Sequence, residues 1–315
     1  MKLNRIKVWL LVTVSGLLLV TPPIALVLDE PFYLTVIGRI MIFAIAALSL
    51  DLILGFGGMI SLGHAAYLGI GAYAVGILSF YGINNAWLQL PIAIFGSAIV
   101  AFIIGIICLR TSGIYFIMIT LAMTQLLYFL GISLETYGGD DGLPIDRSIF
   151  FEAFDLGDEI NLYYLIFAFL VIMTLFSWRL INSRFGVVIR GAQENEMRMH
   201  AIGFSTFRYK LLAFTIAGSM CGLSGFLYAN LNEFVTPEYM HWFRSGEIMI
   251  MVLVGGMGTL FGPLFGAAAY LLFEDIISGW TEHWMVIFGP LLVLLVLFAK
   301  KGLWGFLPDR DQNDV

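Results

Sequence analysis

The chain has 315 residues, of which 60% are hydrophobic and 12% are charged, and its formal net charge at pH 7 is −6. Soluble domains carry roughly 25% charged residues, so this chain has too few polar side chains to cover a globular surface in water. The composition excludes an ordinary soluble protein. The two cysteines, Cys108 and Cys221, each lie in an apolar run and exclude a disulfide framework.

Apolar runs occur along the whole chain. About 20 apolar residues cross a bilayer as an α-helix. Ten runs predict ten such helices, at residues 8–28, 32–54, 64–80, 91–109, 114–133, 160–178, 211–231, 246–260, 264–277 and 284–299. The first is too long for a signal peptide and no A-x-A site follows it, so we interpret it as a retained helix. We therefore predict an all-α integral membrane protein, with residues 1–315 forming a single transmembrane domain.

Lysine and arginine indicate the orientation of these helices, because they gather in cytoplasmic loops. If both termini are cytoplasmic, 13 of the 16 basic residues lie inside, two lie outside, and Arg39 lies within the second helix. One missing helix before residue 179 would place a strongly basic segment outside. The charge pattern therefore favours ten helices with both termini in the cytoplasm.

Two connections are long enough to act as more than turns. Residues 134–159 form an acidic outer loop, and residues 179–210 form a basic inner loop. The inner loop predicts a short amphipathic helix bounded by Gly191 and Gly203. Such a helix can lie on the membrane surface or fit a partner's socket.

A glycine-rich stretch, GGMISLGHAAYLGIGAY at 57–73, is echoed by GGMGTLFGPLFGAAAY at 255–270. The echo predicts a parallel internal repeat. Glycine-interrupted helices at matching positions point to a translocation path, so we place Gly57, Gly58, Ser61, Gly255, Gly256 and Thr259 on that path. For Gly69, Gly71, Gly76 and Gly266, close helix packing is the favoured interpretation.

Several polar residues within the apolar runs have two interpretations. His64 is either a path residue or a structural hydrogen-bond partner, and Thr120 and Thr124 either line the path or bond back to the preceding helical turn. Charges inside a membrane are functional by default. For Arg39 and Asp51, however, we favour side chains that reach toward the membrane surface. Glu274, Asp275 and Glu282 are expected to be solvated.

Motifs for chemistry are missing from the sequence. No G-x-x-x-x-G-K-[ST], H-E-x-x-H or G-x-S-x-G occurs. We therefore expect a protein that is not an enzyme, with no cofactor, metal or nucleic-acid partner and no ATP site of its own.

Five stretches together resemble one family. They are LDLILGFGGMISLGHAAYLGIGAYAVGIL, LRTSGIYFIMITLAMTQLLYFL, YGGDDGL, SRFGVVIRGAQENEMRMHAIGFSTFRYKLLAFTIAGSMCGLSGFLYA and VLVGGMGTLFGPLFGAAAYLLFED. In order and spacing they are similar to the larger permease subunit of high-affinity branched-chain amino acid ABC importers.

The resemblance implies a multi-pass protein of the bacterial inner membrane that moves a small-molecule substrate by alternating access. The implied partners are a second homologous permease, two cytoplasmic ATPases and a periplasmic binding protein. Residues 179–210 would then form the coupling loop. Its implied ATPase contacts are Glu194, Glu196, Arg198 and Gly203.

The resemblance also implies that residues 134–159 form a periplasmic loop facing the binding protein, in which Gly138, Gly139, Asp140, Asp141 and Gly142 are the candidate contacts. Leucine, isoleucine and valine are the implied cargo, with urea or short amides as the alternative. A self-sufficient secondary transporter or channel remains a competing interpretation. It would need an ion-coupling carboxylate within the membrane, for which Asp51 is the candidate.

Overall fold

The structure is a computed structural model, and it describes residues 5–28, 32–151, 154–280, 283, 286, 289, 290 and 302–305. Most of this part is helical. The long helices are α1 (Arg5–Leu28), α2 (Phe32–Leu54), α3 (His64–Phe80), α4 (Ala86–Cys108), α5 (Ile114–Ser133), α6 (Glu159–Ile181) and α9 (Thr206–Asn232). Shorter helices are α7 (Arg184–Glu194), α8 (Glu196–Ala201), α10 (Trp242–Gly255), α11 (Gly262–Ser278) and α13 (Gly302–Gly305).

The apolar runs predicted the positions of these helices well. Three runs, 32–54, 64–80 and 114–133, coincide with α2, α3 and α5. By length and composition, five of the described helices can cross a membrane, namely α2, α4, α5, α6 and α9. The run at 284–299 falls almost entirely outside the described residues, as does Glu282. The ten-helix count, the cytoplasmic termini and the repeat stay predictions.

Two expectations about helix limits are wrong. The run at 246–260 is not one helix, because α10 ends at Gly255 and the backbone of Gly256 has a φ of +117°, which an α-helix does not allow. The loop helix is not bounded by Gly191 either. Gly191 lies inside α7, where its missing side chain leaves room for the Met199 sulfur.

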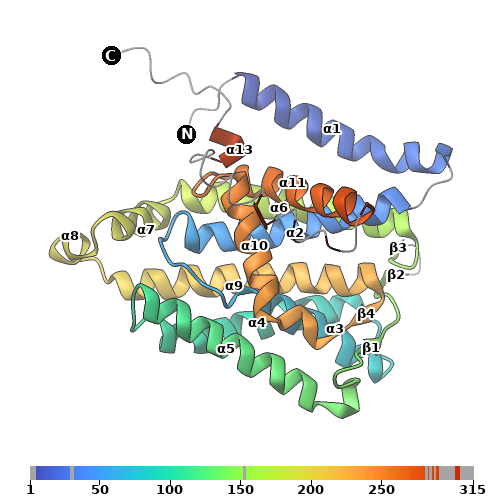
Figure 1. Ribbon diagram of the computed structural model, residues 1–315, viewed down its shortest axis with the longest axis horizontal. Coiled ribbons are helices and arrows are strands. Elements are labelled where there is room, and N and C mark those ends of the chain that lie inside the picture. The colour runs from blue at the N-terminus through green and yellow to red at the C-terminus, as the bar shows by residue number, and fades with distance from the viewer. Residues whose placement is uncertain are drawn as a thin grey trace.

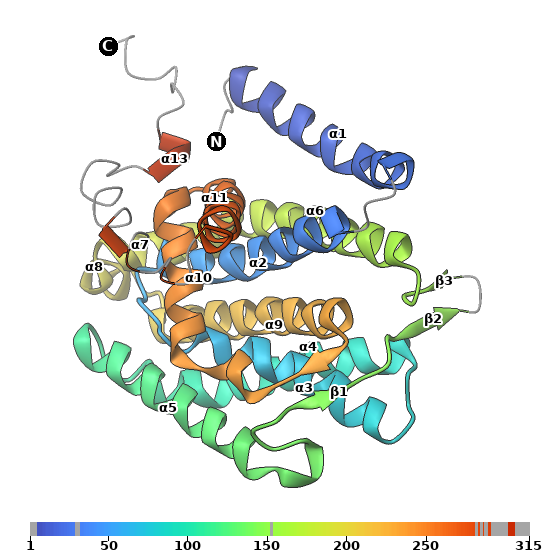
Figure 2. The ribbon, with the colours of Figure 1, turned by 45° about the vertical axis from the view of Figure 1, so that its right-hand side comes forward.

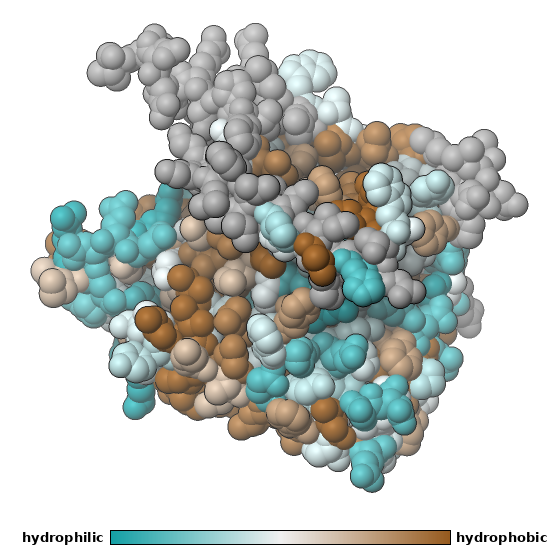
Figure 3. Space-filling view, viewed as in Figure 1, coloured by the Kyte–Doolittle hydropathy of each residue, from teal (hydrophilic) through white to brown (hydrophobic). Residues whose placement is uncertain are grey.

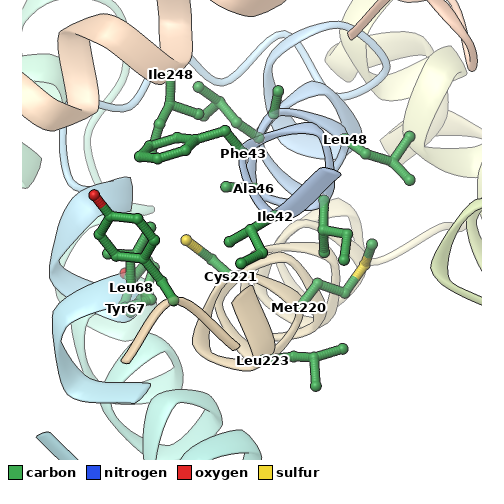
Figure 4. Packing of buried hydrophobic residues seen from close by; sticks show 14 of the residues in the cluster. Ile42, Phe43, Ala46, Leu48, Tyr67, Leu68, Met220, Cys221, Leu223 and Ile248 are labelled. Carbon is green, nitrogen blue, oxygen red and sulfur yellow. The ribbon is translucent and has the colours of Figure 1, made fainter. Parts of the chain in front are cut away.

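The helices form a bundle around α9. Figures 1 and 2 show α9 between α3, α4 and α5 on one side and α2, α6 and α11 on the other, with α10 crossing steeply. Residues of α2 and α9 are mostly buried, whereas most residues of α4, α5 and α6 are only partly buried or exposed. In Figure 4, Phe43, Tyr67 and Cys221 lie in the resulting core, where α2, α3 and α9 meet.

Glycines bring α3 into backbone contact with α9. A Cβ on Gly71 would collide with the Gly222 carbonyl, and a Cβ on Gly225 would collide with the Leu68 carbonyl. In lipid, helices associate through such close packing rather than through burial of apolar area. The packing interpretation of Gly71 is confirmed. It also holds for Gly69, Gly76 and Gly266, which lie against Met240, Val235 and the Met251 carbonyl.

The two ends of the bundle differ. One end carries α7 and α8, and we call this projection the knob and this end the knob end. The opposite end, which we call the strand end, carries the short elements η1 (Glu135–Tyr137), β1 (Leu143–Pro144), β2 (Ile149–Phe151), β3 (Phe154–Asp155) and β4 (Phe234–Val235). Strands β1 and β4 pair antiparallel, and so do β2 and β3. The β1–β4 pair ties the chain before α6 to the chain after α9.

Candidate functional site

The glycine-rich segment 55–63 is not helical and connects α2 to α3. At its start, Gly58 has a φ of +67°, and a Cβ on it would lie 2.8 Å from Cγ of Gln193 in α7. At its end, the carbonyl of His64 accepts a hydrogen bond from Cys221 Sγ at 3.3 Å, near the middle of α9. The segment therefore runs from the knob end into the middle of the bundle, as Figure 1 shows.

The second glycine stretch forms a turn that touches the first. A Cβ on Gly55 would collide with the backbone nitrogen of Gly258, so the first turn has no room for a side chain at this point. The α10–α11 turn is closed by Thr259, whose hydroxyl donates to the Gly256 carbonyl at 2.6 Å and accepts from Gly262 N at 3.1 Å. The structure thus brings the two predicted glycine pairs to the same end of the bundle.

Asp51 joins these two turns. Its Oδ1 accepts a hydrogen bond from Gly258 N at 2.8 Å, and its side chain is fully buried. Its Oδ2 is buried and has no hydrogen-bond partner within the described chain. The expectation that Asp51 reaches toward the membrane surface is therefore wrong, because the α10–α11 turn provides a backbone donor inside the protein.

The predicted polar path residues gather where α3 begins. Leu62 N donates to Thr120 Oγ1 at 3.3 Å, and Gly63 N donates to Ser61 Oγ at 3.1 Å. Thr120 and Thr124 also donate to carbonyls of the preceding turn of α5, at 2.9 and 3.0 Å. The two threonines thus make the back-bonds that the structural alternative predicts, and Thr120 additionally holds the end of segment 55–63 against α5.

His64 has a structural hydrogen bond. Its Nε2 lies 2.7 Å from Ser49 Oγ, whose own proton goes to the Ala46 carbonyl at 2.7 Å. Nε2 is therefore the donor, and Nδ1 is left buried without a partner in the described chain. This contact fixes the first residue of α3 against α2.

Helix α10 also begins inside the bundle. The element η2 (Pro237–Met240) turns back from the strand end, and Met240 packs against Gly69 of α3. Ser245, in the first turn of α10, accepts a hydrogen bond from Ala65 N at 2.9 Å. The first turns of α3 and α10 therefore meet near the middle of the bundle. The segment before α3 enters from the knob end, and the segment with η2 before α10 enters from the strand end.

The knob carries the predicted ATPase contacts. Glu194 and Arg198 are exposed, and their side chains make no hydrogen bond or ion pair with any described residue. Gly203 follows α8 with a φ of +93°. Met197 is 82% exposed and Ile202 is 64% exposed, and Figure 3 shows the knob projecting as a mostly hydrophilic surface with pale brown atoms at its tip.

Glu196 differs from its neighbours, because its carboxylate is hydrogen-bonded and holds α8 against the start of α9. It accepts hydrogen bonds from Thr206 Oγ1 at 2.8 Å and from Lys210 Nζ at 2.7 Å, both at the start of α9. Partial burial would raise the pKa of Glu196, but the hydrogen bonds from Lys210 and Thr206 outweigh it and hold the pKa below its usual value. Sequence reasoning missed these hydrogen bonds.

The predicted binding-protein contacts lie in the turn before β1. Asp140 and Asp141 are exposed, whereas Gly139 is buried with a φ of +50°. Gly138 and Gly142 also have positive φ, so the three glycines shape the turn. The two carboxylates are the part of this turn that another protein can reach.

Two sets of charged residues pair within the bundle. Arg39 lies 3.2 Å from Glu274 and 3.6 Å from Asp275, both on α11. A second pair joins Arg244 to Glu247 at 2.7 Å, and Glu247 is buried. The expectations that Arg39 reaches toward the surface and that Glu274 and Asp275 are only solvated are wrong, because α2 and α11 lie side by side and neutralise these charges.

A cavity of about 600 Å³ lies between α1, α2, α6 and α11, and none of the residues described above lines it. Its lining contains no charged side chain. Over the described ranges, no group of three or more His, Cys, Asp or Glu side chains is placed to hold a metal ion.

Sequence reasoning also missed Gln193, Gly55, Gly258 and Ser245. Gly55 and Gly258 could have been found from the sequence, since each lies two or three residues from a glycine pair. Gln193 and Ser245 carry no pattern, because their importance comes only from which backbone atoms they meet.

The family comparison agrees with this architecture. Residues 32–297 match the model of the family described as branched-chain amino acid transport system / permease component. The LivM permease proteins of high-affinity branched-chain amino acid transport systems from Salmonella typhimurium and Escherichia coli are each 29% identical over 287 residues, covering 84% of this chain and 68% of theirs. A probable branched-chain amino acid transport permease protein LivM from Methanocaldococcus jannaschii is 25% identical, covering 83% of this chain and 90% of its own.

No solved structure matches the chain. The family match covers most of its length, and five of its described helices are long and apolar enough to cross a membrane. The chain is a multi-pass membrane protein and belongs to the permease component family of branched-chain amino acid transport systems.

Proposed function

We propose that this chain is the permease subunit of an ATP-driven importer that carries leucine, isoleucine and valine across the bacterial inner membrane. It pairs with a second homologous permease, two cytoplasmic ATPases and a periplasmic binding protein. The family membership and the LivM relatives support the substrate class. The knob end is cytoplasmic in this proposal, in keeping with the lysines and arginines of residues 179–210.

The observation that carries the proposal is the knob. It projects from the bundle with Met197 82% exposed and Ile202 64% exposed, beside Glu194 and Arg198, whose charges pair with no described residue. An exposed apolar patch rimmed by polar groups marks a protein interaction site. We assign it to an ATPase, because the chain has no phosphate-binding loop and must receive energy from a partner.

In this mechanism the substrate leaves the binding protein at the strand end, beside Asp140 and Asp141. ATP binding brings the ATPases together and moves the knob. The bundle then changes from a form open to the strand end to a form open to the knob end. The meeting point of α3 and α10 lies between the two openings, because both helices begin near the middle of the bundle.

The test is uptake of labelled leucine by cells that lack their own system and are supplied with this chain and its partners. Wild-type uptake should depend on ATP. The double variant Glu194→Ala/Arg198→Ala should insert normally but lose uptake, and Arg110→Ala, an exposed arginine outside the knob, should not. Uptake by this chain alone would refute the proposal and favour a secondary transporter or channel. Uptake of urea or short amides without leucine would change the cargo only.

A further inference from the structure

Residues 58–62 have one side that the protein leaves open. Gly58 and Ile60 are exposed, Ile60 to 45%, whereas Met59 and Ser61 between them are buried. The segment thus presents alternate residues to the interior and to the outside of the subunit. An apolar side chain and a bare glycine occupy its open side.

The backbone of this segment is largely unpaired. Within the described chain, neither the N–H of Ile60 nor the carbonyls of Gly58, Met59 and Ile60 take part in a hydrogen bond. A peptide group left unsatisfied in hydrocarbon costs several kcal/mol, so non-helical backbone at membrane depth either lies inside protein or faces water. The open side of residues 58–62 therefore does not face lipid.

Residues 58–62 also lie at membrane depth. The segment leaves the knob end at Gly58 and reaches the middle of α9 at His64. Six residues of extended chain cover up to about 20 Å, which exceeds half of a hydrocarbon core of roughly 30 Å. Residues 58–62 thus lie in the half of the membrane nearest the knob, between Gly58 beside Gln193 and His64, which meets Ser49 five residues before the end of α2 at Leu54.

Gln193 connects the segment directly to the knob. Its Nε2 donates to the Gly55 carbonyl at 3.2 Å, and its side chain lies over Gly58. On the other side of the same turn, Asp51 accepts from Gly258 N. A shift of α7 would therefore act first on the turn at 55–58 and, through Asp51, on the start of α11.

We propose that residues 58–62 form a wall of the translocation path in the half nearest the knob, with Ile60 projecting into it, and that Gln193 transmits the movement of α7 to this wall. The inference rests on the proposed function and names the residues that couple the knob to the path. Ile60 meets the passing substrate, and Gln193 is a positioning residue.

The first experiment measures the accessibility of Ile60. In the assembled transporter in vesicles, Ile60→Cys is treated with a charged, membrane-impermeant thiol reagent, and Phe95→Cys on α4 serves as the control, since Phe95 is 66% exposed on the outer face of the bundle. Both native cysteines are buried. Ile60→Cys should react at least about tenfold faster, because the reactive thiolate forms in water and not in lipid.

ATP with vanadate should change the labelling rate of Ile60→Cys and leave that of Phe95→Cys unchanged. Equal, slow labelling of both cysteines in every state would overturn the assignment of the wall.

The second experiment tests Gln193. Gln193→Ala should leave assembly and ATP hydrolysis intact while uptake per ATP falls by several-fold, up to about tenfold, the range that one hydrogen bond supplies. It should also abolish the ATP-dependent change in labelling at Ile60→Cys. The matched control is Thr111→Val, which removes another side-chain bond to a carbonyl, between Thr111 and Cys108 at 2.8 Å, in the α4–α5 connection.

The two proposals fail differently. If the wild-type complex shows no ATP-driven uptake, the proposed function itself is refuted. If the wild type transports and Gln193→Ala keeps both its uptake per ATP and its labelling change, only the coupling role of Gln193 is overturned.

Discussion

Asp51 offers a sharp test of how the two glycine turns are held together. Its Oδ1 accepts a hydrogen bond from Gly258 N at 2.8 Å, and the side chain is fully buried. Asp51→Asn keeps an oxygen acceptor of the same shape, whereas Asp51→Leu removes it. Leaving the partly buried Gly258 N–H unpaired costs roughly 1–2 kcal/mol, which corresponds to a Tm lower by roughly 2–8 °C in a chain of this size.

The assay is the thermal unfolding of purified protein in detergent, followed by loss of the monodisperse peak in size-exclusion chromatography. We expect Asp51→Asn to unfold near the wild-type temperature and Asp51→Leu several degrees lower. If the two variants are equally destabilised, the negative charge matters rather than the acceptor. If neither is destabilised, the turn is held by other contacts.

The same pair of variants separates two transport mechanisms. A secondary transporter that couples ions through the Asp51 carboxylate would lose ion-driven uptake in Asp51→Asn, although this variant folds. An ATP-driven permease in which Asp51 only joins two turns should retain most of its uptake in Asp51→Asn. Uptake by Asp51→Asn, measured with and without an ion gradient, therefore tests the assignment independently of stability.

Three further predictions concern packing and charge. Gly225→Ala places a Cβ against a carbonyl of α3 and should destabilise the protein by about 1–3 kcal/mol, whereas Gly96→Ala, which meets nothing within 4 Å, should not; equal Tm values would contradict the close contact. Arg39→Met and Glu274→Gln should each lower the Tm, and the double variant should recover part of the loss, with a coupling of about 0.5–3 kcal/mol; strict additivity would show that the pair contributes nothing. The pKa of Glu196 is lowered in the folded protein, so the stability that its carboxylate gives the knob is fully present above the usual carboxyl pKa and is lost as the pH falls through the lowered pKa. Backbone hydrogen exchange in α8, corrected for intrinsic rates, should therefore rise over that acidic range in the wild type. It should not rise in Glu196→Gln.

The close-packed glycines and the buried charges show how far sequence reasoning extends. Gly71 was assigned to helix packing from its place in an apolar run, and its contact with the Gly222 carbonyl bears this out. Arg39 and Asp51 were assigned to the membrane surface because their partners, Glu274, Asp275 and Gly258, are more than 200 residues away along the chain. Nothing local in the sequence connects them.

For the candidate translocation path, too, the sequence predicts some features and the fold is needed for the others. The pair Gly57 and Gly58 favours a break in the helix, since paired glycines are costly within a helix, but the sequence leaves close packing against a neighbour as the alternative. It could not place the interruption against Gln193, nor show that α3 and α10 begin beside each other at Ala65 and Ser245. Those contacts depend on how the segments before α3 and α10 fold back into the bundle.

Local composition is enough to predict the membrane environment, the helical class, the positions of most helices and the basic loop that forms the knob. Each of these follows from local composition, because a bilayer requires about 20 apolar residues in a helix that satisfies its own backbone. Which buried polar groups meet, and which backbone groups of the described residues stay unpaired, follows from the packing of the helices and not from local composition. Hydrogen-bond partners must lie within about 3.5 Å, and residues far apart in the chain reach that distance only after the helices have packed.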